Sequence, residues 1–253
     1  MLSVEIIAHR GASYDAPENT LLAVNLAWQQ GADAVEIDVH MSKDGRMVVI
    51  HDDDTGKVAG VRKRVRDQTW AELRALDVGQ WKGRSWAGTC LSTLEEVLAV
   101  VPAGRRLFIE IKCGSECLPA FVAAFRDSGC QPAQVVPIGF ALETMRRVKE
   151  ALPELEVGWV SDFKRALPSG RWTPTAATLI RQAQAAGLDA LDVNGRGPVE
   201  AGFVRQVKDA GLKLYVWTVD SPALARRLMA AGVDGITTNR PRWLRERLES
   251  ADG

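Results

Sequence analysis

Apolar, strand-like segments alternate with helical patterns along almost the whole chain. A short apolar segment at 4–8 precedes a helical pattern at 21–30, and the same succession continues to a last strand-like segment at 235–238 and a closing helix at 241–248. A helix between two strands carries the chain back to the edge where the first strand began, so consecutive strands run parallel with helices outside them. The pattern therefore predicts an α/β fold built on a parallel sheet.

The number of strand-like segments narrows this fold class. Nine segments of this 253-residue chain read as strands, and about 250 residues is typical of an eight-stranded parallel barrel. The segments 34–39 and 47–50 are joined by Ser42-Lys43-Asp44-Gly45, a hairpin turn too short to hold a helix. One of these two segments is therefore extra or irregular, and the sequence leaves open which. We predict a TIM-type (β/α) barrel that forms a single domain over residues 1–253, because no interior linker is rich in Pro, Gly or Ser.

Residues 52 to about 90 interrupt the alternation. The stretch is polar and contains Trp70, Trp81 and Trp86, with only one short helical segment at 70–76. A long irregular stretch inside a compact chain is commonly a functional excursion. We therefore expect a small inserted region at about 52–90, whose tryptophans either form a small core or line a pocket, and we favour the core.

Charge and composition limit the classes of partner. The chain has 32 basic and 32 acidic residues, so its formal net charge of +0 creates no overall field that attracts nucleic acid or an anionic membrane. We see no export signal and no apolar run as long as a membrane span. We therefore expect a cytoplasmic protein that binds no nucleic acid and does not associate stably with membranes. Its cysteines, Cys90, Cys113, Cys117 and Cys130, are then expected to be free thiols.

Two carboxylates occupy one face of an otherwise apolar strand. In Val35-Glu36-Ile37-Asp38-Val39 the residues Glu36 and Asp38 are two apart, so their side chains point to the same side. Adjacent carboxylates resist burial unless a cation pairs with them, and Mg²⁺ and Ca²⁺ prefer oxygen ligands. The alternative is a strand with one solvated face, on which both acids meet water.

Polar residues also gather at the ends of other predicted strands. With the first pair they are, in chain order, His9, Arg10, Glu36, Asp38, His51, Glu110 and Lys112. In a parallel barrel the ends of the strands meet at one face, where the active site lies. Glu110 then completes an oxygen site for Mg²⁺ or Ca²⁺, and Arg10 and Lys112 place positive charge beside it. This combination points to metal-assisted chemistry on an anion, with phosphate as the first candidate.

The ordered motifs of the chain resemble those of the glycerophosphodiester phosphodiesterase family. The matching segments are Ala8-His9-Arg10-Gly11, Pro17-Glu18-Asn19-Thr20, Glu36-Ile37-Asp38-Val39, Lys43-Asp44-Gly45, Val49-Ile50-His51-Asp52, Ser92-Thr93-Leu94-Glu95-Glu96-Val97-Leu98, Ile109-Glu110-Ile111-Lys112, Val216-Trp217-Thr218-Val219 and Asp234-Gly235-Ile236-Thr237-Thr238-Asn239-Arg240-Pro241. They run in family order over nearly the whole chain. The resemblance implies an eight-stranded barrel with an insertion after the His-Asp motif, and hydrolysis of small-molecule glycerophosphodiesters to glycerol 3-phosphate and an alcohol.

The resemblance also implies roles for the site residues. Metal ligands of the family correspond to Glu36, Asp38 and Glu110, and its acid/base histidines correspond to His9 and His51. Phosphate-contacting positions correspond to Arg10 and Lys112, and apolar positions of the pocket correspond to Phe140 and Trp217. Which histidine is the acid stays open, as does whether water or the substrate's own glycerol hydroxyl attacks.

Two other functions share some of these features. A related barrel phosphodiesterase that acts on phospholipids, of the phosphatidylinositol or sphingomyelin type, would use a similar set of histidines and carboxylates. A non-catalytic barrel that binds a sugar phosphate has no need of both histidines and all three acids. The chain departs from the family pattern at 53–58 and at 137–140, around the expected pocket, which leaves the preferred alcohol undefined.

Overall fold

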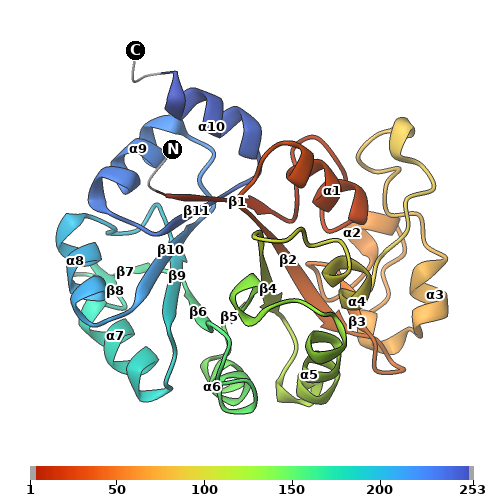
Figure 1. Ribbon diagram of the computed structural model, residues 1–253, viewed down its shortest axis with the longest axis horizontal. Coiled ribbons are helices and arrows are strands. Elements are labelled where there is room, and N and C mark those ends of the chain that lie inside the picture. The colour runs from red at the N-terminus through yellow and green to blue at the C-terminus, as the bar shows by residue number, and fades with distance from the viewer. Residues whose placement is uncertain (1–3, 251–253) are drawn as a thin grey trace.

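Eight parallel strands form a closed barrel in the computed structural model, which describes residues 4–250 (Figure 1). The order around the barrel is β1-β11-β10-β9-β6-β5-β4-β2, and pairing of β2 with β1 closes the ring. The strands are β1 (Glu5–His9), β2 (Ala34–Met41), β4 (Arg106–Ile111), β5 (Val135–Gly139), β6 (Gly158–Ser161), β9 (Ala190–Asn194), β10 (Lys213–Trp217) and β11 (Gly235–Thr238). The predicted eight-stranded α/β barrel is confirmed.

The ninth strand-like segment, β3 (Met47–Val49), lies outside the barrel. β2 is the one strand with which it pairs among the described residues, and it runs antiparallel to β2 with Val49 opposite Val39; on its other side Val48 bridges to Thr93. Because β2 extends beyond the barrel edge and β3 returns along it, the amide of Ile50 donates to the carbonyl of Asp38 at 3.0 Å. The extra segment therefore brings the following residue, His51, back to the mouth of the barrel.

Helices surround the barrel, as Figure 1 shows. They are α1 (Leu21–Gln29), α4 (Leu94–Leu98), α5 (Leu118–Asp127), α6 (Leu142–Ala151), α7 (Ala176–Ala185), α8 (Ala201–Asp209), α9 (Pro222–Ala231) and α10 (Pro241–Glu249). Side-chain hydroxyls cap the starts of α1, α4, α7 and α9; at α1 the hydroxyl of Thr20 accepts from the amide of Ala23. Among residues 4–250, no helix has the length and apolar character needed to cross a membrane.

The interior of the barrel is filled rather than hollow. A separate apolar cluster occupies it, made of Ile7, Ala34, Phe108, Val136, Ile138, Val160, Ala190 and Tyr215. A second and larger cluster lies between the strands and the helices. Because the interior cluster closes the barrel from below, inward-facing residues one step further along the strands form the floor of any site at the carboxyl ends.

The predicted insertion packs beside β3 and contains α2 (Gly56–Ala59), η1 (Val65–Asp67), α3 (Trp70–Arg74) and η2 (Arg84–Trp86). It has an apolar core of its own with Val58, Val65 and Leu73 at its centre. Trp70 packs against this core, as we expected, whereas Trp81 and Trp86 are not part of it.

The remaining elements lie outside the insertion. The segments η3 (Ser115–Cys117) and η4 (Pro132–Gln134) are single turns, and β7 (Lys164–Ala166) and β8 (Arg171–Thr173) form a hairpin between β6 and α7. The four cysteines are free thiols.

Candidate active site

A cavity of about 260 Å³ lies at the carboxyl ends of the barrel strands. Its walls include eight of the nine residues singled out from the sequence, namely His9, Arg10, Glu36, His51, Glu110, Lys112, Phe140 and Trp217. The ninth, Asp38, is 1% exposed and lies beneath the cavity wall in contact with Arg10 and Lys112. The predicted convergence of strand ends therefore brings these side chains into one place.

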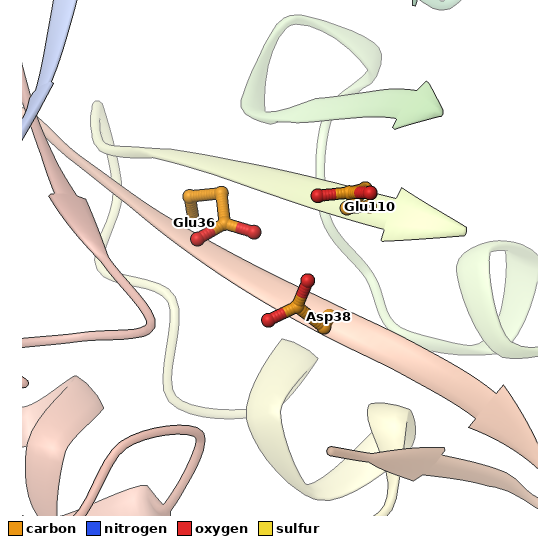
Figure 2. A group of neighbouring side chains, drawn as sticks. All are labelled: Glu36, Asp38 and Glu110. Atoms are coloured by element: carbon orange, nitrogen blue, oxygen red, sulfur yellow. The ribbon is translucent and has the colours of Figure 1, made fainter. Parts of the chain in front are cut away.

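Three carboxyl groups face one another at one side of the cavity. Figure 2 shows Glu36 and Asp38 on β2 and Glu110 on the neighbouring β4, where Asp38 and Glu110 are register partners. Each offers an oxygen, and these oxygens all lie within 4.8 Å of one another. Glu36 and Asp38 are buried, so the alternative of a solvated strand face is wrong.

The chemistry of this oxygen cluster fits a hard divalent cation. Glu36 Oε1 is buried and has no hydrogen-bond partner among the described residues. The Nζ of Lys112 lies 3.1 Å from Asp38 Oδ1 and 2.7 Å from Glu110 Oε1, without the angles of hydrogen bonds. Mg²⁺ and Ca²⁺ take carboxylate oxygens, and Glu36 Oε1 has neither a hydrogen-bond partner nor an ion-pair partner among the described residues. These three residues are therefore able to hold such an ion.

The pKa values of the three acids are shifted because the carboxyl groups are buried close to one another. Burial and the charge of Asp38 raise the pKa of Glu36 well above its ordinary value, and the same two causes raise the pKa of Glu110 to about 7. Burial opposes ionisation of Asp38 as well, but the charges of Lys112 and Arg10 outweigh it and lower its pKa to about 2. Negative charge is thus in excess at this side of the cavity, and a cation would relieve it.

Arg10 anchors the cluster through both its backbone and its side chain. Its amide donates to Glu36 Oε2 at 3.0 Å, its Nε lies 3.1 Å from Asp38 Oδ2, and its Nη1 donates to Glu18 Oε1 at 2.9 Å. This geometry requires a left-handed backbone, with φ of 57° at Arg10 and 78° at Gly11. A Cβ on Gly11 would lie 2.5 Å from the carbonyl carbon of Ala23, so only glycine fits there.

Asn19 is a site residue for which we predicted no role from the sequence. The next residue, Thr20, is the N-cap of α1. Asn19 has a φ of 58°, a conformation that asparagine tolerates better than most residues. Its Nδ2 donates to Asp38 Oδ2 at 2.8 Å, and its Oδ1 accepts from the amide of Asp38 at 3.1 Å. Asn19 therefore fixes the orientation of Asp38.

A chain of hydrogen bonds orients His9. Asn239 Nδ2 donates to Asp220 Oδ2 at 2.6 Å, so its Oδ1 is the atom that faces His9 Nδ1 at 2.7 Å. Because an amide oxygen only accepts, the proton of the imidazole resides on Nδ1, and Nε2 keeps its lone pair. Burial and the charge of Arg10 lower the pKa of His9 to about 4, so that the ring is neutral near pH 7.

His51 has a different partner. Its Nδ1 donates to the carboxylate of Asp52 at 2.6 Å, a contact that holds the tautomer and the orientation of the ring. The backbone carbonyl of His51 accepts from His40 Nε2 at 3.0 Å. His40 directly follows the predicted strand segment 34–39, so the sequence predicts a solvated turn residue at this position. That prediction is wrong, because His40 lies within β2 and burial lowers its pKa.

Aromatic rings form one wall of the cavity. Phe140 and Trp217 pack edge to face with ring centroids 5.9 Å apart. Phe140 is 49% exposed, and the Nζ of Lys112 lies 5.9 Å from its ring centroid. The wall therefore offers apolar surface directly beside the cationic side chain.

Asp192 is a second residue that the sequence did not reveal as functional. It lies on β9 inside a segment that reads as a plain apolar strand, and it lines the cavity while only 4% exposed. Its Oδ1 has no hydrogen-bond partner among residues 4–250. Burial raises its pKa well above the ordinary value, and the charge of Glu110 adds to the effect.

Comparison with known proteins agrees with this geometry. A family model described as the glycerophosphoryl diester phosphodiesterase family matches residues 9–242. A glycerophosphodiester phosphodiesterase of Caldanaerobacter subterraneus subsp. tengcongensis is 33% identical over 246 residues, which cover 94% of this chain and 95% of the relative. An Oleispira antarctica phosphodiesterase, solved in complex with the product sn-glycerol-3-phosphate, has a TM-score of 0.86 and 29% identity, covering 97% of this chain and 96% of its own. The chain belongs to the glycerophosphoryl diester phosphodiesterase family of enzymes.

Proposed function

We propose that this enzyme cleaves glycerophosphodiesters to glycerol 3-phosphate and an alcohol with a divalent cation, Mg²⁺ or Ca²⁺, held by Glu36, Asp38 and Glu110. The observation that carries the proposal is the gathering of three carboxyl oxygens within 4.8 Å of one another at one side of a cavity whose walls also include both histidines. The glycerol 3-phosphate bound in the Oleispira antarctica relative supports this product.

Positive charge from the chain neutralises the substrate. A phosphodiester is an anion and repels an attacking oxygen until that charge is balanced. Arg10 and Lys112 line the cavity and are held in place by the same carboxylates. A cation at the carboxylates would polarise the phosphoryl oxygens and stabilise the charge that grows in the transition state. Phe140 and Trp217 would exclude water from one side of the bound substrate.

The partners of the two histidines suggest distinct roles. His9 is neutral, with the lone pair of Nε2 free, so it would accept the proton of the attacking oxygen. His51 is held in place by the Asp52 carboxylate, 2.6 Å from its Nδ1, and we assign it the complementary role of donating a proton to the leaving oxygen. The same pair serves attack by water and attack by a glycerol hydroxyl.

Single substitutions test these roles. We expect His9→Ala and His51→Ala each to lower the release of glycerol 3-phosphate by about 10²–10⁴-fold, as loss of an acid or base does. A p-nitrophenyl phosphodiester of glycerol separates the roles, because its leaving group needs no proton. His51→Ala should regain most of its activity on this ester and His9→Ala should not. Rescue of His9→Ala alone would reverse the assignment, and wild-type rates in either variant would refute its role.

Removal of metal tests the cation. EDTA should abolish turnover of glycerophosphocholine, and added Mg²⁺ or Ca²⁺ should restore it. Full activity after exhaustive chelation would exclude the proposed site.

The preferred substrates follow from the size of the cavity. A volume of about 260 Å³ favours small, deacylated phosphodiesters over phospholipids. We therefore propose a small-molecule substrate in the cytoplasm, without nucleic acid or stable membrane association. Faster turnover of phospholipid vesicles than of glycerophosphocholine would favour the lipid-cleaving alternative.

A further inference from the structure

We propose that Asp192 binds the terminal hydroxyl of the glycerol moiety and thereby selects substrates in which that hydroxyl is free. The inference rests on the function proposed above and adds to it a residue that determines specificity. It follows from the burial of Asp192, from its place on the barrel and from the shapes of two adjoining cavities.

The carboxyl group of Asp192 is buried, yet one of its oxygens has no hydrogen-bond partner among the described residues. The side chain lines the cavity and is 4% exposed, and its Oδ1 is buried with no hydrogen-bond partner among residues 4–250. The cavity residues Val160, on the neighbouring strand β6, and Ile138, on the next strand β5, are apolar and offer no polar group. An unsatisfied buried polar atom costs about 1–3 kcal/mol. A bound molecule that brings a hydroxyl to this point would remove that cost.

The topology places Asp192 across the barrel from the three carboxylates. From β2 to β9 there are four steps around the ring in either direction, through β4, β5 and β6 or through β1, β11 and β10. β9 is therefore opposite β2, which carries Glu36 and Asp38. A phosphate bound near these acids and Arg10 would reach Asp192 only through the far end of one of its substituents.

The depth of Asp192 within the barrel also places it at the far end of a bound substrate. Its register partners are Val160 on β6 and Tyr215 on β10, both members of the apolar cluster that fills the barrel interior. Asp192 therefore lies at the floor of the cavity, directly above this cluster. The group that reaches it is the innermost atom of the substrate, which in a glycerol phosphate is the terminal hydroxyl.

Two cavities meet at the expected position of the phosphate. His51 and Lys112 line both the 260 Å³ cavity and a broader one of about 760 Å³ that is bordered by Asp53, Lys57 and Arg62 of the insert. A phosphodiester at this junction would send one substituent into each. Glycerol is the constant part of the substrate and matches the narrow cavity, whereas the variable alcohol matches the broad one.

A carboxyl group suits a hydroxyl in either protonation state. An ionised carboxylate accepts the hydroxyl hydrogen, and a neutral carboxyl group both donates and accepts. An acylated or missing terminal hydroxyl leaves Asp192 without a partner in a closed cavity. Sites built to bond a substrate hydroxyl reject analogues without it far more strongly than apolar pockets do.

The test compares two substrates. One is glycerophosphocholine, and the other is the phosphocholine ester of propane-1,2-diol, which lacks only the terminal hydroxyl and keeps the secondary hydroxyl for an intramolecular attack. We expect the wild-type enzyme to prefer glycerophosphocholine by about 10–100-fold in kcat/KM, the range of one buried hydrogen bond. In Asp192→Leu this preference should fall to below about 3-fold, through loss on glycerophosphocholine alone.

Two further variants serve as controls. Asp192→Asn keeps a donor and an acceptor and should retain most of the preference. Asp189→Asn changes an acid of the same segment that pairs with Lys149 outside the cavity, and it should leave the preference unchanged. Thermal unfolding of each variant shows whether it is folded.

Distinct outcomes overturn the two proposals. An equal loss on both substrates in Asp192→Leu, or an unchanged preference, would show a structural role and refute the inference about Asp192. If Asp192→Leu does not fold, equal rates on both substrates in the wild type, or an equal loss on both substrates in Asp192→Asn, would refute it as well. Absence of any metal-dependent hydrolysis of glycerophosphocholine would instead refute the proposed function.

Discussion

Both ends of the barrel interior contain acidic and basic side chains. At one end these groups are paired, and at the other some of the acids have an oxygen without a partner within residues 4–250. At the amino ends of the strands, Arg106 pairs with Glu5 at 2.8 Å and with Glu156 at 2.9 Å. The hydroxyl of Tyr215 donates to the second oxygen of Glu156 at 2.5 Å. At the carboxyl ends, buried oxygens of Glu36 and Asp192 have no hydrogen-bond partner among the described residues.

The comparison separates stability from function within one fold. Arg106 pairs with two acids and packs 5.0 Å from the ring of Phe108, so its network closes the bottom of the barrel with its charges paired. The upper end keeps excess negative charge at Glu36, Asp38 and Glu110, which a bound cation would balance. Changes at the lower end should therefore alter folding, and changes at the upper end should alter catalysis.

Glu36→Gln should have the largest effect and should separate the two ends most clearly. We expect kcat/KM to fall by about 10²–10³-fold or more, because electrostatic stabilisation of the transition state is lost. The free energy of unfolding should stay equal or rise, since a buried charge is removed. In the wild type a saturating divalent cation should raise the Tm, as any ligand of the native state does, and in the variant this shift should disappear. A variant that is inactive because it is less stable would contradict the comparison.

Glu156→Gln should show the reverse pattern. Loss of the ion pair with Arg106 should lower the free energy of unfolding by about 1.5–3 kcal/mol, the range for hydrogen bonds to charged groups. Urea denaturation measures this change. At temperatures where the variant is folded, kcat/KM should remain within about 2-fold of the wild type. A large loss of activity in the folded variant would mean that the two ends are coupled.

The contribution of Glu156 should depend on pH. Burial opposes its ionisation, but Arg106, Lys213 and Tyr215 outweigh burial and lower its pKa. A lowered folded-state pKa stabilises the protein above the unfolded-state pKa of about 4.3, and this stabilisation is lost as the pH falls through the folded-state pKa. The difference in unfolding free energy between the wild type and Glu156→Gln should therefore be constant from about pH 7 to pH 5.5 and shrink below about pH 4. A difference that grows on acidification would reverse the sign.

Lys213→Met should have the smallest effect. Lys213 also pairs with Glu156, at 2.6 Å, but its side chain is half exposed. Exposed ion pairs contribute about 0–1 kcal/mol, so urea denaturation should detect at most a small change and kcat/KM should be unaffected. A loss as large as that of Glu156→Gln would show that exposure is a poor guide to the energetics of this network.

Much of the upper end follows from local sequence. The two-residue spacing of Glu36 and Asp38 fixes one face of a strand, and parallel strands bring their carboxyl ends together, so contact with Glu110 is predictable. The choice of β3 as the extra segment was not predictable, because pairing with β2 is antiparallel and depends on contacts outside the segment.

The roles of residues whose partners lie far away in the chain could not be predicted from the sequence. Asn239 orients His9 from 230 positions away, and its own amide is fixed by Asp220. Asp192 looks like an isolated acid in an apolar strand, and only the closed ring places it opposite β2. His40 was misjudged because β2 continues two residues beyond Val39, to Met41, where we expected a turn.

The position of β3 outside the barrel divides the enzyme into two exchangeable parts. His9 lies at the end of the barrel strand β1, whereas His51 follows β3, the strand that leads into the insert. A chimera in which residues 53–90 come from a relative would retain the glycerol cavity and both imidazoles while it replaced the borders of the broader cavity. Grafts of this kind offer a route to enzymes that release different alcohols from a common glycerol phosphate.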